Sequence, residues 1–243
     1  MNLIRSVSAT LLVLVFAAHC AGCATRKPRL DSDARTKAAQ AAMTPEVSLR
    51  LLKEGNARFV HGELVARDWP ALRSKTAAGQ YPHAVVLSCL DSRASSELVF
   101  DQGLGDVFNA RVAGNVLNDD VLGSMEFACK AAGAKLIAVV GHTRCGAVKG
   151  ACAGTELGHL TALLAKIRPS VAQAEAQAGD GPRTGPAFVD KVAVLNVEHV
   201  MAEISARSPI LRQMIESGEV GLVGGIHHLD TGEVVFLGKE PQR

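Results

Sequence analysis

The stretch AVVLSCLDSR, residues 84–93, decides the fold of this chain, because an almost continuous apolar run is followed at once by polar side chains. An apolar run without polar alternation is typical of a strand that is buried on both faces of a parallel sheet. Parallel sheets occur in α/β folds, in which helices cover both faces. Cys89 follows the strand, at the edge where open parallel sheets gather their ligands.

A second segment repeats this arrangement. Residues 135–141, KLIAVVG, form another apolar run, and the segment His142-Thr143-Arg144-Cys145 follows it. Between the two segments lie an apolar stretch at 107–112 and a helical pattern at 119–132. A connection of this length can return the chain to a neighbouring parallel strand. The sequence therefore predicts that both polar segments meet at one edge of the sheet.

The rest of the chain supplies further helices. Thr44 and Pro45 are typical of an N-cap and a first helical residue, and the apolar pattern after them predicts a helix that ends at His61-Gly62. We expect an α/β fold with a mostly parallel central β-sheet, flanking helices and an N-terminal helical arm, in a single domain over 44–243. The other predicted elements are helices at 71–78, 157–176 with a break at Pro169, and 189–205, strands at 220–226 and 234–237, and a loop at 179–186.

The composition fits one domain that acts on a small molecule. At 243 residues and 48% hydrophobic, the chain can bury one sizeable core. Its 26 basic and 24 acidic side chains are scattered, so no footprint for nucleic acid is visible. An aromatic content of 4% argues against a carbohydrate or peptide groove lined by aromatic side chains.

Residues 1–22 have the pattern of a secretory signal peptide, with Arg5 before an apolar run that is short for a membrane span. The segment Cys20-Ala21-Gly22-Cys23 resembles a bacterial lipoprotein signal, although Cys20 stands in place of the usual Leu. We expect an exported protein, periplasmic or membrane-anchored by lipidated Cys23, with a flexible tether over 23–43. Cleavage near Ala24, an uncleaved anchor, and a cytoplasmic protein with an apolar tail are the alternatives.

Cys89, His142 and Cys145 form a candidate zinc site. Thiolates and imidazole are ligands that Zn²⁺ prefers, and three protein ligands leave a position open for water, as in catalytic sites. His142 and Cys145 can reach one ion from the turn that starts a helix, and the N-terminus of that helix favours a Cys145 thiolate. Gly146 permits close approach of the backbone.

The other cysteines leave an alternative open. An oxidising compartment could pair Cys89, Cys129, Cys145 and Cys152 into disulfides. The spacing favours metal binding, because Cys89 and Cys145 each have polar partners of their own. Cys129 follows an apolar helix face and is interpreted as a small buried hydrophobe, and Cys152 is interpreted in the same way.

Asp91 and Arg93 are two positions apart, so on an extended segment their side chains project to the same side and can form a charge-assisted pair. The simplest alternative is a surface salt bridge. Next to Cys89, however, an oriented carboxylate could accept a proton from metal-bound water or bind the metal itself. The arginine would decide which of these occurs.

The motifs Cys-x-Asp-x-Arg and His-x-x-Cys together resemble the β-class carbonic anhydrases, and the resemblance extends from Thr44 to Leu237. It implies one Zn²⁺ per subunit, held by Cys89, His142 and Cys145, with Asp91 and Arg93 as a dyad beside the fourth ligand. It also implies reversible hydration of CO₂ to bicarbonate and a proton by zinc-bound hydroxide. The same family is matched by the segments at 52–59, 103–106 and 111–115.

The resemblance also implies substrate contacts and an assembly. Gln80 matches a residue that reaches the substrate from the partner subunit, Phe108 and Ala113 match an apolar wall that holds CO₂, and Gly146 lies beside the ligands. The family implies a homodimer or a higher homo-oligomer. The alternative functions are hydrolysis of CS₂ or COS on the same fold, and a catalytically silent zinc-binding module, against which the intact Asp91 and Arg93 pair argues.

A regulatory expectation follows from one departure from part of the family. Some members close at low pH, when the Asp leaves its Arg and becomes a fourth zinc ligand, and bicarbonate stabilises that state in a pocket of Trp, Arg and Tyr. Arg111 matches the Arg of that pocket, but Val86 replaces the Trp and the only Tyr is Tyr81. We therefore expect Asp91, a metal ligand only in such a closed state, to stay paired with Arg93.

Overall fold

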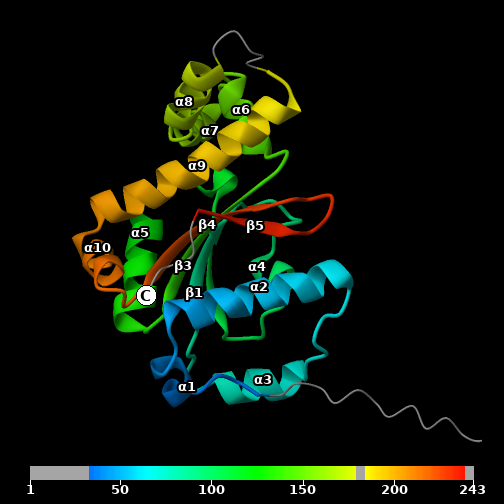
Figure 1. Ribbon diagram of the computed structural model, residues 1–243, viewed down its shortest axis with the longest axis vertical. Helices are drawn as coiled ribbons and strands as arrows, with labels where there is room; N and C mark the ends of the chain where they lie inside the picture. The colour runs from blue at the N-terminus through cyan, green and yellow to red at the C-terminus, as the bar shows by residue number, and fades with distance from the viewer. Residues whose placement is uncertain (1–32, 179–183, 239–243) are drawn as a thin grey trace, which may run out of the picture.

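The computed structural model describes residues 33–178 and 184–238, in which helices pack on both faces of a five-stranded sheet (Figure 1). The strand order is β2-β1-β3-β4-β5; the first four strands are parallel and β5 is antiparallel to β4. This confirms the predicted α/β fold with a mostly parallel sheet. The strands are β1 (Ala84–Ser88), β2 (Val107–Arg111), β3 (Leu136–His142), β4 (Gly221–His227) and β5 (Val234–Leu237).

Two apolar clusters hold the helices to the sheet. Adjacent residues of β1, such as Val85 and Val86, point to opposite faces of the sheet and belong to different clusters, because successive side chains of a strand alternate in direction. Leu52 of α2 (Pro45–His61) packs on one face, whereas α5 (Asp119–Glu126), α9 (Pro186–Arg207) and α10 (Pro209–Glu216) pack on the other. The remaining helices are α1 (Lys37–Ala41), α3 (Trp69–Thr76), α4 (Ser96–Val99), α6 (Gly146–Cys152), α7 (Gly158–Ala165) and α8 (Arg168–Ala178), with a short 3₁₀ segment at Ala113–Asn115.

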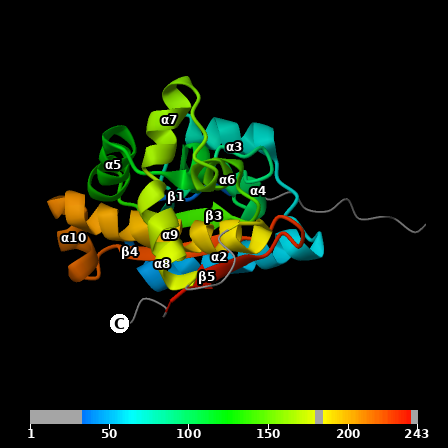
Figure 2. The same ribbon diagram turned by 90° about the horizontal axis from the view of Figure 1, so that it is seen from above.

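The long helix α9 runs across the sheet toward α10 (Figures 1 and 2). Two glycines in the strands below it allow close packing. A Cβ at Gly141 would lie 2.9 Å from Val197 of α9, and a Cβ at Gly224 would lie 2.7 Å from the same side chain. Glycine at these positions therefore fixes α9 directly on β3 and β4.

Most predicted elements are confirmed, with local differences. Helix α2 has the predicted cap, because the Thr44 hydroxyl accepts a hydrogen bond from the Val47 amide and Gly62 closes the helix with φ 71°. The predicted helix over 119–132 is instead α5 followed by a π-helical segment, Phe127–Ala131. Helix α10 was not predicted. The predicted break near Pro169 separates α7 from α8, and residues 179–183 of the predicted loop lie outside the described residues.

The prediction of a flexible tether up to residue 43 is wrong for the part that the structure describes. Helix α1 lies there, and the buried side chain of Gln40 donates hydrogen bonds to the carbonyls of Pro82 (2.7 Å) and Ala132 (2.8 Å). Both carbonyls precede strands, so this arm packs at the amino end of the sheet. The predicted signal peptide, Cys23 and residues 24–32 lie outside the described residues.

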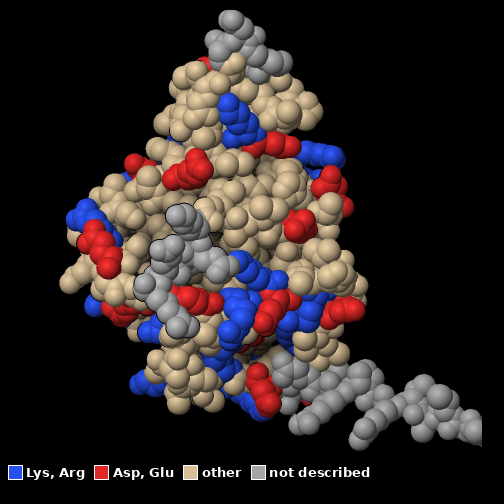
Figure 3. Space-filling model, in the orientation of Figure 1, with Lys and Arg blue, Asp and Glu red and all other residues tan. Residues whose placement is uncertain are grey.

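The described part of the chain has no helix that is long and apolar enough to cross a membrane. The face drawn in Figure 3 carries interspersed acidic and basic side chains, with no large area of one sign. This face agrees with the scattered charges of the sequence.

Candidate metal centre

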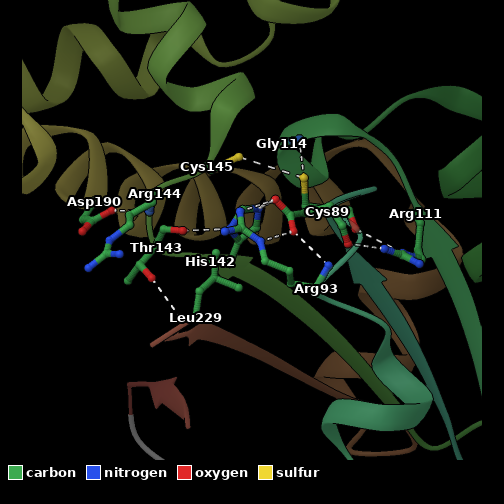
Figure 4. A network of polar contacts seen from close by, with 11 residues as sticks. Cys89, Arg93, Arg111, Gly114, His142, Thr143, Arg144, Cys145, Asp190 and Leu229 are labelled. Carbon is green, nitrogen blue, oxygen red and sulfur yellow. Dashed lines mark hydrogen bonds and ion pairs between the residues drawn. The ribbon is translucent and has the colours of Figure 1, made fainter. Parts of the chain in front are cut away.

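Three ligand side chains meet at the carboxyl ends of β1 and β3. Cys89 follows β1, His142 is the last residue of β3, and Cys145 precedes α6 (Figure 4). Their ligand atoms lie within 4.8 Å of one another, the two sulfur atoms are 4.0 Å apart, and all three side chains are buried. The structure thus brings together the three residues that the sequence predicted as zinc ligands.

The hydrogen bonds of His142 leave one ring atom for a metal. Nδ1 lies 2.9 Å from the Thr143 carbonyl oxygen, which can only accept, so Nδ1 carries the proton. Nε2 is buried and has no hydrogen-bond partner among the described residues. An unprotonated imidazole nitrogen and two thiolates form the donor set that Zn²⁺ prefers. The residues present therefore fit a zinc ion.

The two cysteines are electrostatically coupled. Hydrogen bonding to Cys145 lowers the pKa of the Cys89 thiol, whereas the neighbouring Cys89 sulfur raises the pKa of Cys145. The Gly114 amide also donates to the Cys89 sulfur at 3.3 Å. Two thiolates at this separation repel each other, so a bound divalent cation would allow both to be ionised.

The turn between His142 and Cys145 has an unusual backbone. Arg144 has φ 55°, in the left-handed region that side chains other than glycine rarely adopt. Its amide donates to Asp190 Oδ1 of α9 at 2.7 Å, and the Thr143 amide donates to the His227 carbonyl of β4. This turn directs the Cys145 side chain back toward the end of β1.

Asp91 and Arg93 form the predicted pair with bidentate geometry. Arg93 Nε donates to Asp91 Oδ1 at 2.9 Å, and Nη2 donates to Oδ2 at 2.8 Å. The Arg93 amide also donates to Oδ1, so the segment is a turn and the predicted extended geometry is wrong. Hydrogen bonding from Arg93 holds the pKa of the Asp91 carboxyl well below its usual range.

The dyad lies at the solvent side of the cluster. Asp91 Oδ2 is 3.9 Å from His142 Nε2, the atom left for the metal. The exposed fraction of the side chain is 18% for Asp91 and 59% for Arg93. The carboxylate therefore stands between the buried ligands and the solvent.

Two of the four predicted substrate residues lie at this end of the sheet. Gly146 directly follows Cys145. Ala113 is the first residue of the 3₁₀ segment, and the amide of the next residue, Gly114, donates to the Cys89 sulfur. Gln80 and Phe108 do not approach the ligands in one chain. Gln80 precedes β1 at its amino end, and Phe108 pairs in register with Val85 near the start of that strand.

The residues at the positions of the bicarbonate pocket, which the sequence predicts to be incomplete, have other roles in this structure. Arg111 donates from Nε to the Cys89 carbonyl at 3.1 Å and from Nη2 to the Asp91 carbonyl. Val86 is buried in the core, and Tyr81 packs beside Gly79 at the amino end of the sheet. Arg111 therefore braces the segment that carries Cys89 and Asp91.

The remaining described cysteines are separate from the cluster. Cys129 is buried, as predicted, and burial raises its pKa to about 12. Cys152 is only half-buried. None of the four cysteines in the described residues forms a disulfide.

Sequence reasoning did not identify Asp190 or the bracing role of Arg111. Arg111 stood out only as a family match, and Asp190 lies in no motif. Each contacts a ligand segment from a distant part of the chain, so only the tertiary structure reveals the contact.

Comparison with known proteins gives one family. The family model described as Carbonic anhydrase matches residues 84–234. Carbonic anhydrase 2 of Mycobacterium tuberculosis is 38% identical over 201 residues, which cover 79% of this chain and 92% of that protein. The carbonic anhydrase of Mycolicibacterium smegmatis is 35% identical over 196 residues, which cover 78% and 92%.

Solved structures give the class. The β-carbonic anhydrase CafA of Aspergillus fumigatus has a TM-score of 0.64 at 26% identity, covering 78% of this chain and 88% of that one. The Coccomyxa β-carbonic anhydrase, solved with acetazolamide, has a TM-score of 0.60 at 28% identity, covering 68% and 75%. The α/β fold and the Cys-His-Cys cluster together are those of a zinc-dependent lyase. This chain belongs to the β-class carbonic anhydrases, which hydrate CO₂ reversibly.

Proposed function

We propose that this chain catalyses the reversible hydration of CO₂ with one zinc ion per subunit, held by Cys89, His142 and Cys145. The observation that carries this proposal is the buried three-ligand cluster with an ionised Asp–Arg pair beside it. Zinc, when bound, lowers the pKa of a water ligand toward neutrality and so supplies a nucleophile. The protein residues then orient that nucleophile and handle its proton.

Asp91 is the residue suited to orient the nucleophile. Asp91 Oδ1 accepts two hydrogen bonds, from Nε and from the backbone amide of Arg93. Oδ2 accepts one, from Arg93 Nη2, and lies on the side of His142 Nε2. A second lone pair of Oδ2 therefore remains available to accept a hydrogen bond. Because the pKa of Asp91 is lowered, the carboxylate is ionised at working pH and acts as an acceptor. Arg93, which hydrogen-bonds both carboxylate oxygens, would keep Asp91 from becoming a further ligand of the ion.

The reaction itself can be tested directly. Stopped-flow hydration of CO₂ by purified protein of known zinc content should show turnover in proportion to bound zinc. COS and CS₂ serve as competing substrates in parallel assays, since both are small linear molecules like CO₂. Zinc-loaded protein that hydrates no CO₂ would refute the proposal, and preferential hydrolysis of COS or CS₂ would favour the alternative substrate.

A homo-oligomer is part of this proposal. Strand β2 is at the edge of the sheet and none of its residues is fully buried, whereas every residue of β1 and β3 is buried. Phe127 is 59% exposed and packs edge-to-face on Phe108 across 6.2 Å, beside an open hollow of about 550 Å³. Two β-carbonic anhydrases of Sordaria macrospora, which share the fold at 24% identity, are tetrameric. These features support a second copy along β2.

Export and lipidation of Cys23 complete the proposal. Nine residues, 24–32, lie between Cys23 and Asp33, the first residue that the structure describes, and a chain of ten residue steps reaches at most about 35 Å. Because the arm packs at the amino end of the sheet, a lipid at Cys23 would attach the protein from the end opposite the metal centre.

Mass spectrometry of protein from a bacterial host tests the export proposal. The mature chain should begin at an acylated Cys23, and Cys23→Ala should release the protein from membranes. An unprocessed Met1 in the cytosolic fraction would contradict export. A chain cleaved near Ala24 without acyl groups would support export but not the anchor.

A further inference from the structure

The turn that carries the ligands His142 and Cys145 depends on one residue with a left-handed backbone conformation. Arg144, with φ 55°, is one of three residues other than glycine with positive φ among the described residues; the others are Asp101 and Asn115. This backbone conformation disfavours any side chain with a Cβ, so the surrounding structure must hold it. It separates His142 from Cys145, and the direction of the Cys145 side chain depends on it.

The Arg144 side chain does not hold this conformation. It is 67% exposed, and its nearest carboxylate partner, Asp230, is exposed as well and lies 3.8 Å away. An exposed pair at this separation contributes little. The backbone amide, in contrast, donates to Asp190 Oδ1 at 2.7 Å.

Asp190 is held in place by the packing of its helix. It lies in the second turn of α9, which packs on β3 through the close contact between Gly141 and Val197. Gly141 is directly before His142, so the same strand fixes both the ligand and the helix that carries Asp190. Figure 4 shows Asp190 beside Arg144, on the far side of the turn from Cys89.

We infer that Asp190 is a positioning residue of the metal centre. It touches none of the three ligands; its carboxylate holds the left-handed turn at Arg144, and this turn places the Cys145 sulfur 4.0 Å from that of Cys89. The inference rests on the proposed zinc site and concerns how the free protein is preorganised for the ion. Outer groups of this kind typically change metal affinity by about 10- to 100-fold.

The test compares zinc affinity, by competition with a chromophoric chelator, and the absorption spectrum of the Co²⁺-substituted protein. Asp190→Ala should weaken zinc binding by about 10-fold or more and shift the Co²⁺ bands, because the Cys145 ligand is displaced. Asp190→Asn retains an acceptor oxygen and should bind zinc nearly as the wild type does.

A second substitution separates this role from a general loss of stability. Glycine adopts positive φ freely, so adding Arg144→Gly to Asp190→Ala should restore most of the zinc affinity and the Co²⁺ spectrum. Arg144→Ala in the same background is the matched control, since it removes the same side chain without freeing the backbone, and it should restore neither. If Asp190→Ala fails to fold, Arg144→Val with Asp190 intact should weaken zinc binding by itself.

Two results would overturn the inference. One is unchanged zinc affinity and Co²⁺ spectrum in folded Asp190→Ala; the other is equal recovery with alanine and glycine at position 144. Both readouts measure metal binding, so they are independent of turnover. Zinc-loaded wild-type protein without CO₂ hydration would instead refute the proposed function and leave these binding comparisons valid.

Discussion

The two ends of the central sheet are built differently. At the carboxyl ends of the strands, His142 Nε2 and His227 Nδ1 are buried without hydrogen-bond partners among the described residues, and Arg93 is open to solvent. At the amino ends, Arg35 Nε and Arg67 Nε also lack a hydrogen-bond partner within the described part of the chain, but each guanidinium group forms an ion pair, with Asp106 and Asp101 respectively. The buried side chains of His83 and Gln40 there are paired. His83 uses both ring nitrogens, toward Ser48 (2.6 Å) and Gln102 (3.0 Å), and Gln40 donates twice.

This difference separates binding from stability. An unpaired buried polar group costs free energy unless a ligand completes it, and at His142 Nε2 the neighbouring thiols of Cys89 and Cys145 supply the rest of a metal site. The side chains of His83 and Gln40, in contrast, spend their hydrogen bonds within the chain and so fix its conformation. The carboxyl end is thus specialised for chemistry, and the amino end connects the arm, α2 and the first strand.

The largest effect should follow removal of a metal ligand. Cys89→Ala, His142→Ala or Cys145→Ala should release zinc and abolish CO₂ hydration, because two ligands bind the ion far more weakly than three. Cys152→Ser is the control, since this half-buried thiol lies outside the cluster, and it should keep both zinc and activity. Metal analysis together with stopped-flow rates checks this. A ligand variant with full zinc and normal turnover would show that the ligand is wrongly assigned.

The next effect concerns the dyad and separates chemistry from coordination at the same end. Asp91→Asn should keep zinc but reduce kcat by roughly 10²- to 10⁴-fold, because a neutral amide orients the nucleophile and accepts its hydrogen bond less well than a carboxylate does. Arg93→Ala should act in the same direction. Glu203→Gln, which removes an exposed ion pair with Arg207 on α9, should change nothing. Near-normal rates in Asp91→Asn would reduce the dyad to a surface salt bridge.

The sequence predicts the carboxyl end better than the amino end, for physical reasons. The ligands and the dyad stand in short motifs directly after buried strands, so local pattern and strand direction together place them. The docked arm depends on Gln40 meeting two carbonyls far away in the chain, and nothing around Gln40 in the sequence indicates this. The same limit applies to the contact from Asp190 to Arg144.

Local geometry was also harder to predict than the existence of elements. Asp91 and Arg93 pair as expected, but through a turn closed by the Arg93 amide, which the alternation of an extended strand does not describe. Pattern analysis likewise gives one helix where Phe127–Ala131 is π-helical. In each case the hydrogen bonds differ while the side-chain spacing remains compatible with the simpler structure.

An intermediate effect is expected for Gln80, which lies at the end of the sheet away from the metal ligands of its own chain. If it serves the partner subunit's site, Gln80→Ala and Cys145→Ala protein, each weakly active or inactive alone, should complement each other when mixed. An equal mixture of randomly exchanging dimers should recover about a quarter of wild-type activity, since half the dimers are mixed and each contains one complete site. Activity no higher than the average of the two separate variants would contradict a role in trans.

The smallest effect is a pH dependence of stability at the amino end. Burial lowers the pKa of His83 from 6.5 to about 4, so the folded protein keeps this ring neutral where the unfolded chain protonates it. The contribution of His83 to the free energy of unfolding is therefore constant above about pH 7. It falls as the pH decreases from 6.5 toward 4, by at most about 3 kcal/mol. In urea unfolding at pH 7.5 and pH 5, His83→Gln should cost stability at pH 7.5 and lose less than the wild type on acidification. His227 and the metal ligands also titrate but are common to both proteins, so the comparison isolates His83. Equal acid-induced losses in the two proteins would show that His83 is protonated in the folded state as readily as in the unfolded chain.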